Sequence, residues 1–430
     1  MVPGGLSFEQ APPIAVPFRF FLTAPLFLLL AAVVFAWRGP EVLMFRHLPA
    51  ALAVTHLVTL GVLTMVMCGA LMQMMPVVAG SPICCARGVA ATVHAGLTAG
   101  ALLLAAYFLW RAPLVGQLAW GFLAVALGVF LAALSHSLWR VAARNATVTA
   151  IGFAVAALAV TAVFGLTLLL ARLGVAGVPY SALAALHPLW GLLGWVGVLV
   201  AGVAYQVVPM FQLTPNYPPQ LTRLLAGGLF AALGLRTAGP FFPGRGGEWL
   251  AFAADAGLAV SVALFAVTTL FLQRRRRRRQ MDATLLFWRV GMVALLLAAA
   301  VWVEGRVFPG WRGQPLLLGI LMLAGFALAT INGMLYKIVP FLAWFHLSSA
   351  LGGRRRVPNM KELLPEARAR GQFRVYLGSL GLLLGALAAP KVFTYPAAAL
   401  LAVNACWLWL NLWSAYRLYR RSNPFAGAAH

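Results

Sequence analysis

Acidic side chains are scarce in this chain: its 430 residues include 8 Asp and Glu, against 32 Lys and Arg. The 4 cysteines do not make a disulfide scaffold, and Cys84 and Cys85 are adjacent with no further ligand at metal-site spacing. The chain also lacks a phosphate-binding Walker loop, a dinucleotide-binding glycine pattern, a nucleophile elbow and an HExxH motif. These absences exclude the common kinds of soluble catalysis.

Apolar side chains make up most of the sequence: 63% of the residues are hydrophobic and only 9% are charged. No soluble core needs that composition, so the sequence predicts an all-α integral membrane protein with about twelve transmembrane helices. We expect a cytoplasmic N-terminal segment (1–16), a single transmembrane domain (17–420) and a cytoplasmic tail (421–430). The expected spans are 17–37, 50–79, 88–110, 114–139, 146–172, 182–212, 220–242, 249–272, 284–304, 314–346, 373–389 and 392–416.

The placement of the basic residues predicts the orientation. The net charge is +24, and most Lys and Arg fall in loops on the side of the N-terminus, including Arg274 to Arg279 and Arg354 to Arg356. Because positive loops are retained in the cytoplasm, both termini are expected to be cytoplasmic, in a bacterial-type inner membrane. We expect the arginine run to meet anionic lipid headgroups. Nucleic acid is not an expected partner, since no aromatic stacking platform accompanies the run.

One motif occurs three times along the chain. It aligns without gaps and at nearly equal intervals, as GALMQMMP (69–76), GVAYQVVP (202–209) and GMLYKIVP (333–340). Regular self-similarity over this length indicates repeated structural units. We therefore expect three pseudo-repeated four-helix units, at 17–139, 146–272 and 284–416.

Two histidines occupy matching places on the first two motif helices. His56 and His187 precede Pro76 and Pro209 by nearly equal lengths of helix, so both lie in the outer layer of the membrane. Neutral imidazole is a good axial ligand of haem iron. The sequence therefore predicts a b-type haem bound by His56 and His187; the alternative for each histidine is a hydrogen bond across helices. Below His187, Gly191 and Gly194 share its helical face and leave room for a flat ligand.

Other candidate residues have a functional and a structural interpretation each. Arg306 and Arg312, on the outer side, suit either a haem propionate or an interfacial belt. Asp255 is either a functional intramembrane acid or the partner of Arg236 or Arg245. A methionine-rich segment makes copper a further candidate cofactor, although methionine is also a routine packing residue. A second metal or haem site is a hypothesis for three histidines near the inner surface, namely His94, His136 and His346.

Several stretches resemble known families. Twelve spans in three quartets, His56 followed by GALMQMMP, and HPLWGLLGW followed by GVAYQVVP resemble the catalytic subunit of the haem-copper oxidase superfamily, which includes cytochrome oxidases and nitric oxide reductases. The opening PFRFFLTAPLFLLLAA and the histidine-led second span are similar to NnrS, a related family of haem- and copper-containing membrane proteins linked to nitric oxide tolerance. The resemblance implies that His56 binds a haem and that His187 is a histidine on an equivalent helix.

The chain departs from the oxidases at their catalytic centre. Oxidases need a histidine pair on helix seven and histidines on helix ten, but LTRLLAGGLFAALGLRTAG has none and span ten has none before His346. A centre that reduces oxygen or nitric oxide is therefore not expected. The resemblance implies a role in nitric oxide response or respiratory electron transfer, beside respiratory-chain proteins. The alternatives are a small-molecule or metal transporter and a non-catalytic assembly or scaffold subunit.

Overall fold

The computed structural model describes residues 11–423 apart from 176, 279, 309 and 352–355. The predicted terminal segments (1–16 and 421–430) therefore lie mostly outside the described residues, as do Arg279, Arg354 and Arg355. In the part that is described the chain is helical and has no strand. Twelve of its helical segments are long and apolar enough to cross a membrane, which confirms an all-α multi-pass membrane protein.

The helices follow the predicted spans closely. In chain order they are α1 (Ala15–Arg38) with η2 (Gly39–Leu43); α2 (Pro49–Val58), η3 (Thr59–Thr64) and α3 (Met65–Ala79); α4 (Ala86–Trp110); α5 (Pro113–Trp139); α6 (Ala146–Arg172); α7 (Tyr180–Leu189), η4 (Trp190–Gly197) and α8 (Val198–Gln212); α9 (Pro219–Ala238) with η5 (Gly239–Phe241); α10 (Arg245–Arg274); α11 (Ala283–Val307); α12 (Gln314–Ile320), η6 (Leu321–Ala327) and α13 (Leu328–Leu351); α14 (Met360–Leu363); α15 (Glu366–Ala388); and α16 (Pro390–Ser422).

The largest differences from the predicted spans are helical extensions. Helix α15 begins at Glu366 instead of 373, and α16 ends at Ser422 instead of 416. Both extensions carry arginines, which a hydropathy criterion assigns to loops. The helices continue nevertheless, because their backbone hydrogen bonds are internal whatever surrounds them and arginine is a good helix former.

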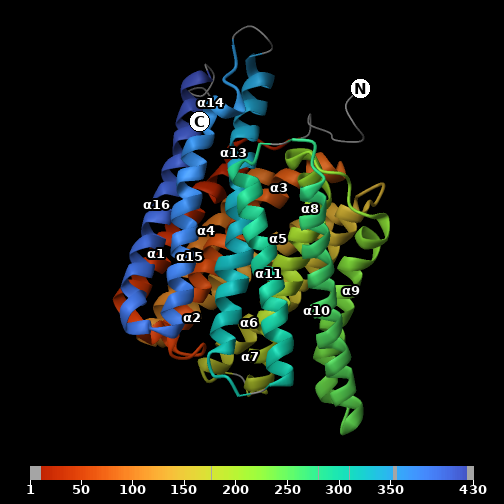
Figure 1. Ribbon diagram of the computed structural model, residues 1–430, viewed down its shortest axis with the longest axis vertical. Helices are drawn as coiled ribbons and strands as arrows, with labels where there is room; N and C mark the ends of the chain where they lie inside the picture. The colour runs from red at the N-terminus through yellow and green to blue at the C-terminus, as the bar shows by residue number, and fades with distance from the viewer. Residues whose placement is uncertain (1–10, 176, 279, 309, 352–355, 424–430) are drawn as a thin grey trace.

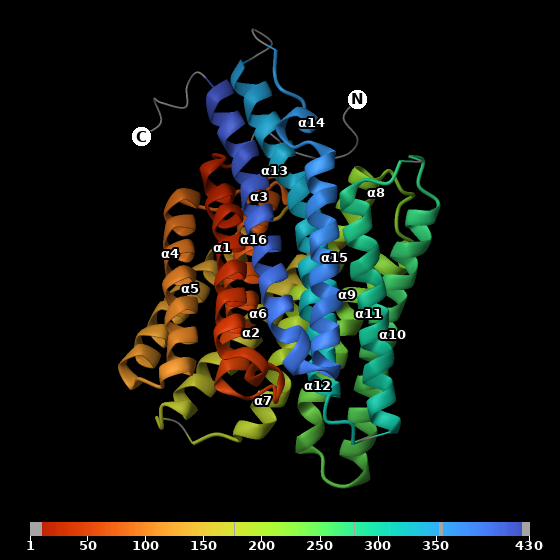
Figure 2. The ribbon, with the colours of Figure 1, turned by 60° about the vertical axis from the view of Figure 1, so that its left-hand side comes forward.

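The first and last spans pack against each other, so the bundle is closed between its two ends. Helices α1 and α16 lie side by side in both views, and α16 also packs on α15 and α13 (Figure 1 and Figure 2). Helices α2 and α7 lie at the end of the bundle opposite to α3, α13 and α14 (Figure 1). The paired helices α4 and α5 cover one flank. The outer-layer residues of α2 and α7 are thus held at one end of a single bundle.

The three motif-bearing spans share one irregularity. Each is interrupted by a π-helical segment, η3, η4 or η6, which lies before the helix that carries Pro76, Pro209 or Pro340. His56 and His187 each stand three residues before the first residue of their π segment, and Leu318 stands at that place in the third span. Such wide turns occur often at functional sites, where they redirect side chains. The grouping of all spans into three quartets stays a prediction.

Candidate functional site

The side chains of His56 and His187 meet across the bundle. Their ring centroids are 6.2 Å apart and the two ring planes differ by only 12°. His56 comes from α2, which packs on α1 and α4, and His187 comes from α7, which packs on α6. Two residues more than a hundred positions apart therefore lie close together with nearly parallel rings. Their matching depths placed them in one layer, and the packing of the helices brings them together.

Each imidazole is oriented by a backbone carbonyl. His56 Nδ1 lies 2.8 Å from the Leu52 carbonyl oxygen, one turn earlier in α2, and His187 Nδ1 lies 3.1 Å from the Thr161 carbonyl oxygen of α6. A carbonyl oxygen only accepts, so Nδ1 carries the proton in both rings. The lone pair of each neutral imidazole is then on Nε2, and a carbonyl bonded to Nδ1–H is the usual outer partner of a metal-binding histidine.

The glycine face below His187 is a helix interface rather than an open groove. A Cβ added at Gly191 would lie 3.3 Å from Thr161 Cγ2, and one at Gly194 would lie 2.8 Å from the Ala157 methyl group. Both neighbours belong to α6. The predicted room for a ligand beside Gly191 and Gly194 is therefore filled, because small residues in membrane helices let two backbones approach closely. The prediction that these glycines share a helical face was correct, but α6 packs on that face where a ligand was expected.

Gly165 of α6 is a site residue that the sequence analysis missed. A Cβ at this position would lie 2.9 Å from Cε1 of the His187 ring, closer than ordinary contact. The ring of His187 thus occupies the space left by a missing side chain, and Thr161, one turn away on the same helix, binds its Nδ1. No local pattern in α6 reveals this, since the helix reads as an ordinary apolar span.

Aromatic and basic side chains surround the outer edge of the histidine pair. The ring of Phe108 lies 5.2 Å from that of His56, and the guanidinium of Arg172 lies 5.6 Å from the Phe108 ring. Arg172 Nε also donates to the Tyr180 hydroxyl at 2.6 Å. In the loop before α2, burial and then the positive charges of Arg46 and Arg172 lower the pKa of His47. The outer rim is therefore positively charged and suits an anionic group.

The arginines predicted at that rim lie elsewhere. Arg306 Nη2 is 3.0 Å from Asp255 Oδ2, and Arg236 Nε is 3.3 Å from Asp255 Oδ1. Arg312 is exposed in the connection between α11 and α12. The structure thus assigns Arg306 to the buried Asp255 and confirms Arg236 as a partner of that carboxylate. The electrostatic reason is direct, because a carboxylate in hydrocarbon requires a compensating charge.

The three histidines predicted near the inner surface have different surroundings. His94 Nε2 lies 2.9 Å from the Thr23 hydroxyl, and its ring packs edge-on against Phe20. His136 is exposed near the end of α5, and His346 is partly buried beside Phe345. Among the described residues, no three His, Cys, Asp or Glu side chains are grouped so as to hold a metal ion. The hypothesis of a second site made by this trio stays a prediction.

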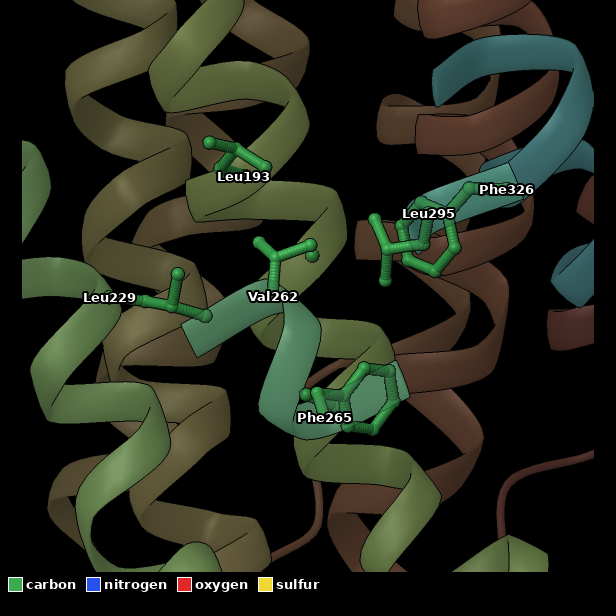
Figure 3. Close-up of a pocket in the computed structure, with 8 residues that line it drawn as sticks. Leu193, Leu229, Val262, Phe265, Leu295 and Phe326 are labelled. Carbon is green, nitrogen blue, oxygen red and sulfur yellow. The ribbon is translucent and has the colours of Figure 1, made fainter. Parts of the chain in front are cut away.

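An apolar cavity lies between the second and third motif spans. It is lined by Leu193, Gly197, Ala201, Leu229, Val262, Phe265, Leu295 and Phe326 (Figure 3). None of these side chains has a titratable group or a metal-ligating atom. Those labelled in Figure 3 come from several helical segments, and Val262 and Phe265 both belong to α10. The cavity offers no chemistry by itself, so the paired histidines remain the candidate site.

No protein-family model matches the chain, and no curated protein matches it. The function is therefore argued from the histidine pair and its surroundings.

Proposed function

We propose that the protein binds a b-type haem whose two axial ligands are His56 and His187. The observation that carries the proposal is the ring separation. With metal–nitrogen bonds of about 2 Å and about 1 Å from each nitrogen to its ring centre, two imidazoles on opposite sides of one metal ion have centroids about 6 Å apart. The centroids of His56 and His187 are 6.2 Å apart, which is close to that separation.

The surrounding residues fit such a group. Both Nδ1 atoms are engaged by carbonyl oxygens, which leaves both Nε2 atoms for the metal. Both side chains are half-buried at the outer end of the bundle. The basic rim made by Arg172 suits the anionic edge of a haem, in place of the predicted Arg306 and Arg312. The protein would hold the two imidazole rings, fix their tautomer through the backbone carbonyl oxygens and limit their contact with bulk water.

The ligand set also favours one class of activity. A haem held by the imidazoles of His56 and His187 would supply one-electron transfer. Together with the resemblance to haem-copper oxidases and NnrS, this supports a role in respiratory electron transfer or nitric oxide response, in an inner membrane with cytoplasmic termini. Asp255 was the main residue favouring a transporter. Its ion pairs with Arg236 and Arg306 support a structural role for it.

The test is the absorption spectrum of the protein purified in detergent after expression with added haem precursor. The wild-type chain is expected to show a Soret band and a low-spin ferric spectrum, and to release b-type haem on extraction. His56→Ala and His187→Ala should each remove most of the low-spin component, while His136→Ala, an exposed histidine on α5, should leave it unchanged. A folded wild-type protein without haem, or variants with unaltered spectra, would overturn the proposal.

A further inference from the structure

Two adjacent thiols stand exposed at the opposite end of the bundle from the histidine pair. Cys84 and Cys85 close the loop between α3 and α4, both are exposed, and their Sγ atoms are 3.7 Å apart. Cys85 has a left-handed backbone with φ of 51°, immediately before α4 begins at Ala86. For a residue other than glycine this conformation costs about 1–2 kcal/mol, so other contacts must hold it in place.

The loop that carries these thiols is anchored to the bundle. Ser81 Oγ donates to the Ser137 carbonyl oxygen at 2.7 Å, and Ser137 Oγ donates to the Ser81 carbonyl oxygen at 2.7 Å. Both serines are buried, as is Ile83, the residue before Cys84. This reciprocal pair connects the loop to the end of α5. The two thiols are thus presented from a fixed backbone and do not need an ordering step to act together.

The sulfur spacing matches a metal chelate. Two thiolates on one three-coordinate ion, with metal–sulfur bonds of about 2.3 Å, have sulfur atoms about 4 Å apart. The observed 3.7 Å, a hydrogen bond between the two thiols, is close to that value and far from the bond of about 2.05 Å in a disulfide. In the described part of the chain no third His, Cys, Asp or Glu completes a group here. Two soft ligands without a harder partner favour Cu(I) over ions that need oxygen or imidazole ligands.

We propose that Cys84 and Cys85 form a surface site for Cu(I), held as a two-thiolate chelate and open on its outer side to a further sulfur ligand from a small thiol. Binding releases the two thiol protons and leaves the copper oxidation state unchanged. The site lies on the side of the bundle where α1 begins and α16 ends (Figure 1), opposite to α2 and α7. It is independent of the proposed haem, with which it shares no residue.

The experiment is a Cu(I) titration of the full chain in detergent, under anaerobic reducing conditions, against a chromophoric Cu(I) chelator. The wild type is expected to take one equivalent. Cys84→Ser and Cys85→Ser should each weaken binding at least about tenfold, since even loss of an outer-shell partner produces a change of that size. Cys406→Ser, which removes an exposed thiol on α16, is the matched control and should bind as the wild type does.

X-ray absorption at the copper edge provides a second readout, with two or more sulfur neighbours expected at about 2.3 Å. Melting temperatures of the three serine variants show that they are folded, as expected for substitutions at exposed positions. Equal Cu(I) affinity in the wild type and in both loop variants would overturn the proposal. So would a bound ion that has nitrogen neighbours in place of sulfur.

Discussion

Gly165→Ala tests the packing that aims His187. The added Cβ would lie 2.9 Å from Cε1 and 3.5 Å from Nδ1 of the ring, about 0.5 Å short of ordinary contact with the former at 3.4 Å. The ring must move away from α6, which is also the helix whose Thr161 carbonyl accepts from Nδ1 at 3.1 Å. Overpacking of this kind costs about 1–3 kcal/mol, and a weakened hydrogen bond adds up to about 1 kcal/mol.

The assay compares apparent melting temperatures and absorption spectra with those of Gly152→Ala. Gly152 lies on the same helix, and a Cβ there meets nothing within 4 Å. That control should be neutral or slightly stabilising, because alanine is the better helix former by about 1 kcal/mol or less. Gly165→Ala should melt several degrees lower and lose low-spin haem signal. If the two variants melt together with identical spectra, the ring of His187 does not lie against Gly165.

Three contacts outside the His187 pocket set further measurable outcomes. Trp195 Nε1 donates to the Thr64 hydroxyl at 3.2 Å. In a double-mutant cycle, Trp195→Phe and Thr64→Val should therefore show a coupling energy of about 0.5–1.5 kcal/mol. Additive effects on the free energy of unfolding would contradict this hydrogen bond. Asp255→Asn should destabilise the protein by about 1–3 kcal/mol. This cost is smaller than the cost of breaking a fully buried ion pair, because the partner Arg306 is half-exposed. Glu248→Gln, at an exposed site on the same helix, is the control. The pKa of His47 is lower in the folded protein than in the unfolded chain. As the pH drops below about 6.5, the unfolded chain therefore binds a proton at His47 before the folded protein does, and the free energy of unfolding should fall. His47→Gln should flatten that acid dependence, and an unchanged pH profile would refute the assignment.

The surroundings of Gly191 and Gly194 could be predicted only in part from helical periodicity. Helical periodicity correctly placed Gly191 and Gly194 on the face of His187, because that depends only on the geometry of one helix. It could not distinguish an open groove from an interface, since the difference depends on α6, a separate span with its own sequence. The same holds for Arg306, whose place near the end of its span was predictable but whose partner, Asp255, lies on another helix.

The three π-helical segments could not be predicted from the sequence either. Their residues read as ordinary apolar helix, and nothing in the repeated glycine–proline motif marks a wide turn. Yet η3 and η4 follow His56 and His187 at the same interval. A π turn is maintained by packing around it, which a local pattern does not record.

Hydropathy alone determined that this chain crosses a membrane and where its spans lie. The fixed rise per residue along a helix placed His56 and His187 at matching depths along their spans. Only the tertiary structure decided which side chains meet at that depth. Lateral neighbours depend on how helices distant in the sequence pack, so the 6.2 Å approach of His56 and His187, the carbonyls that orient them and the arginine at their rim emerge only from the assembled bundle.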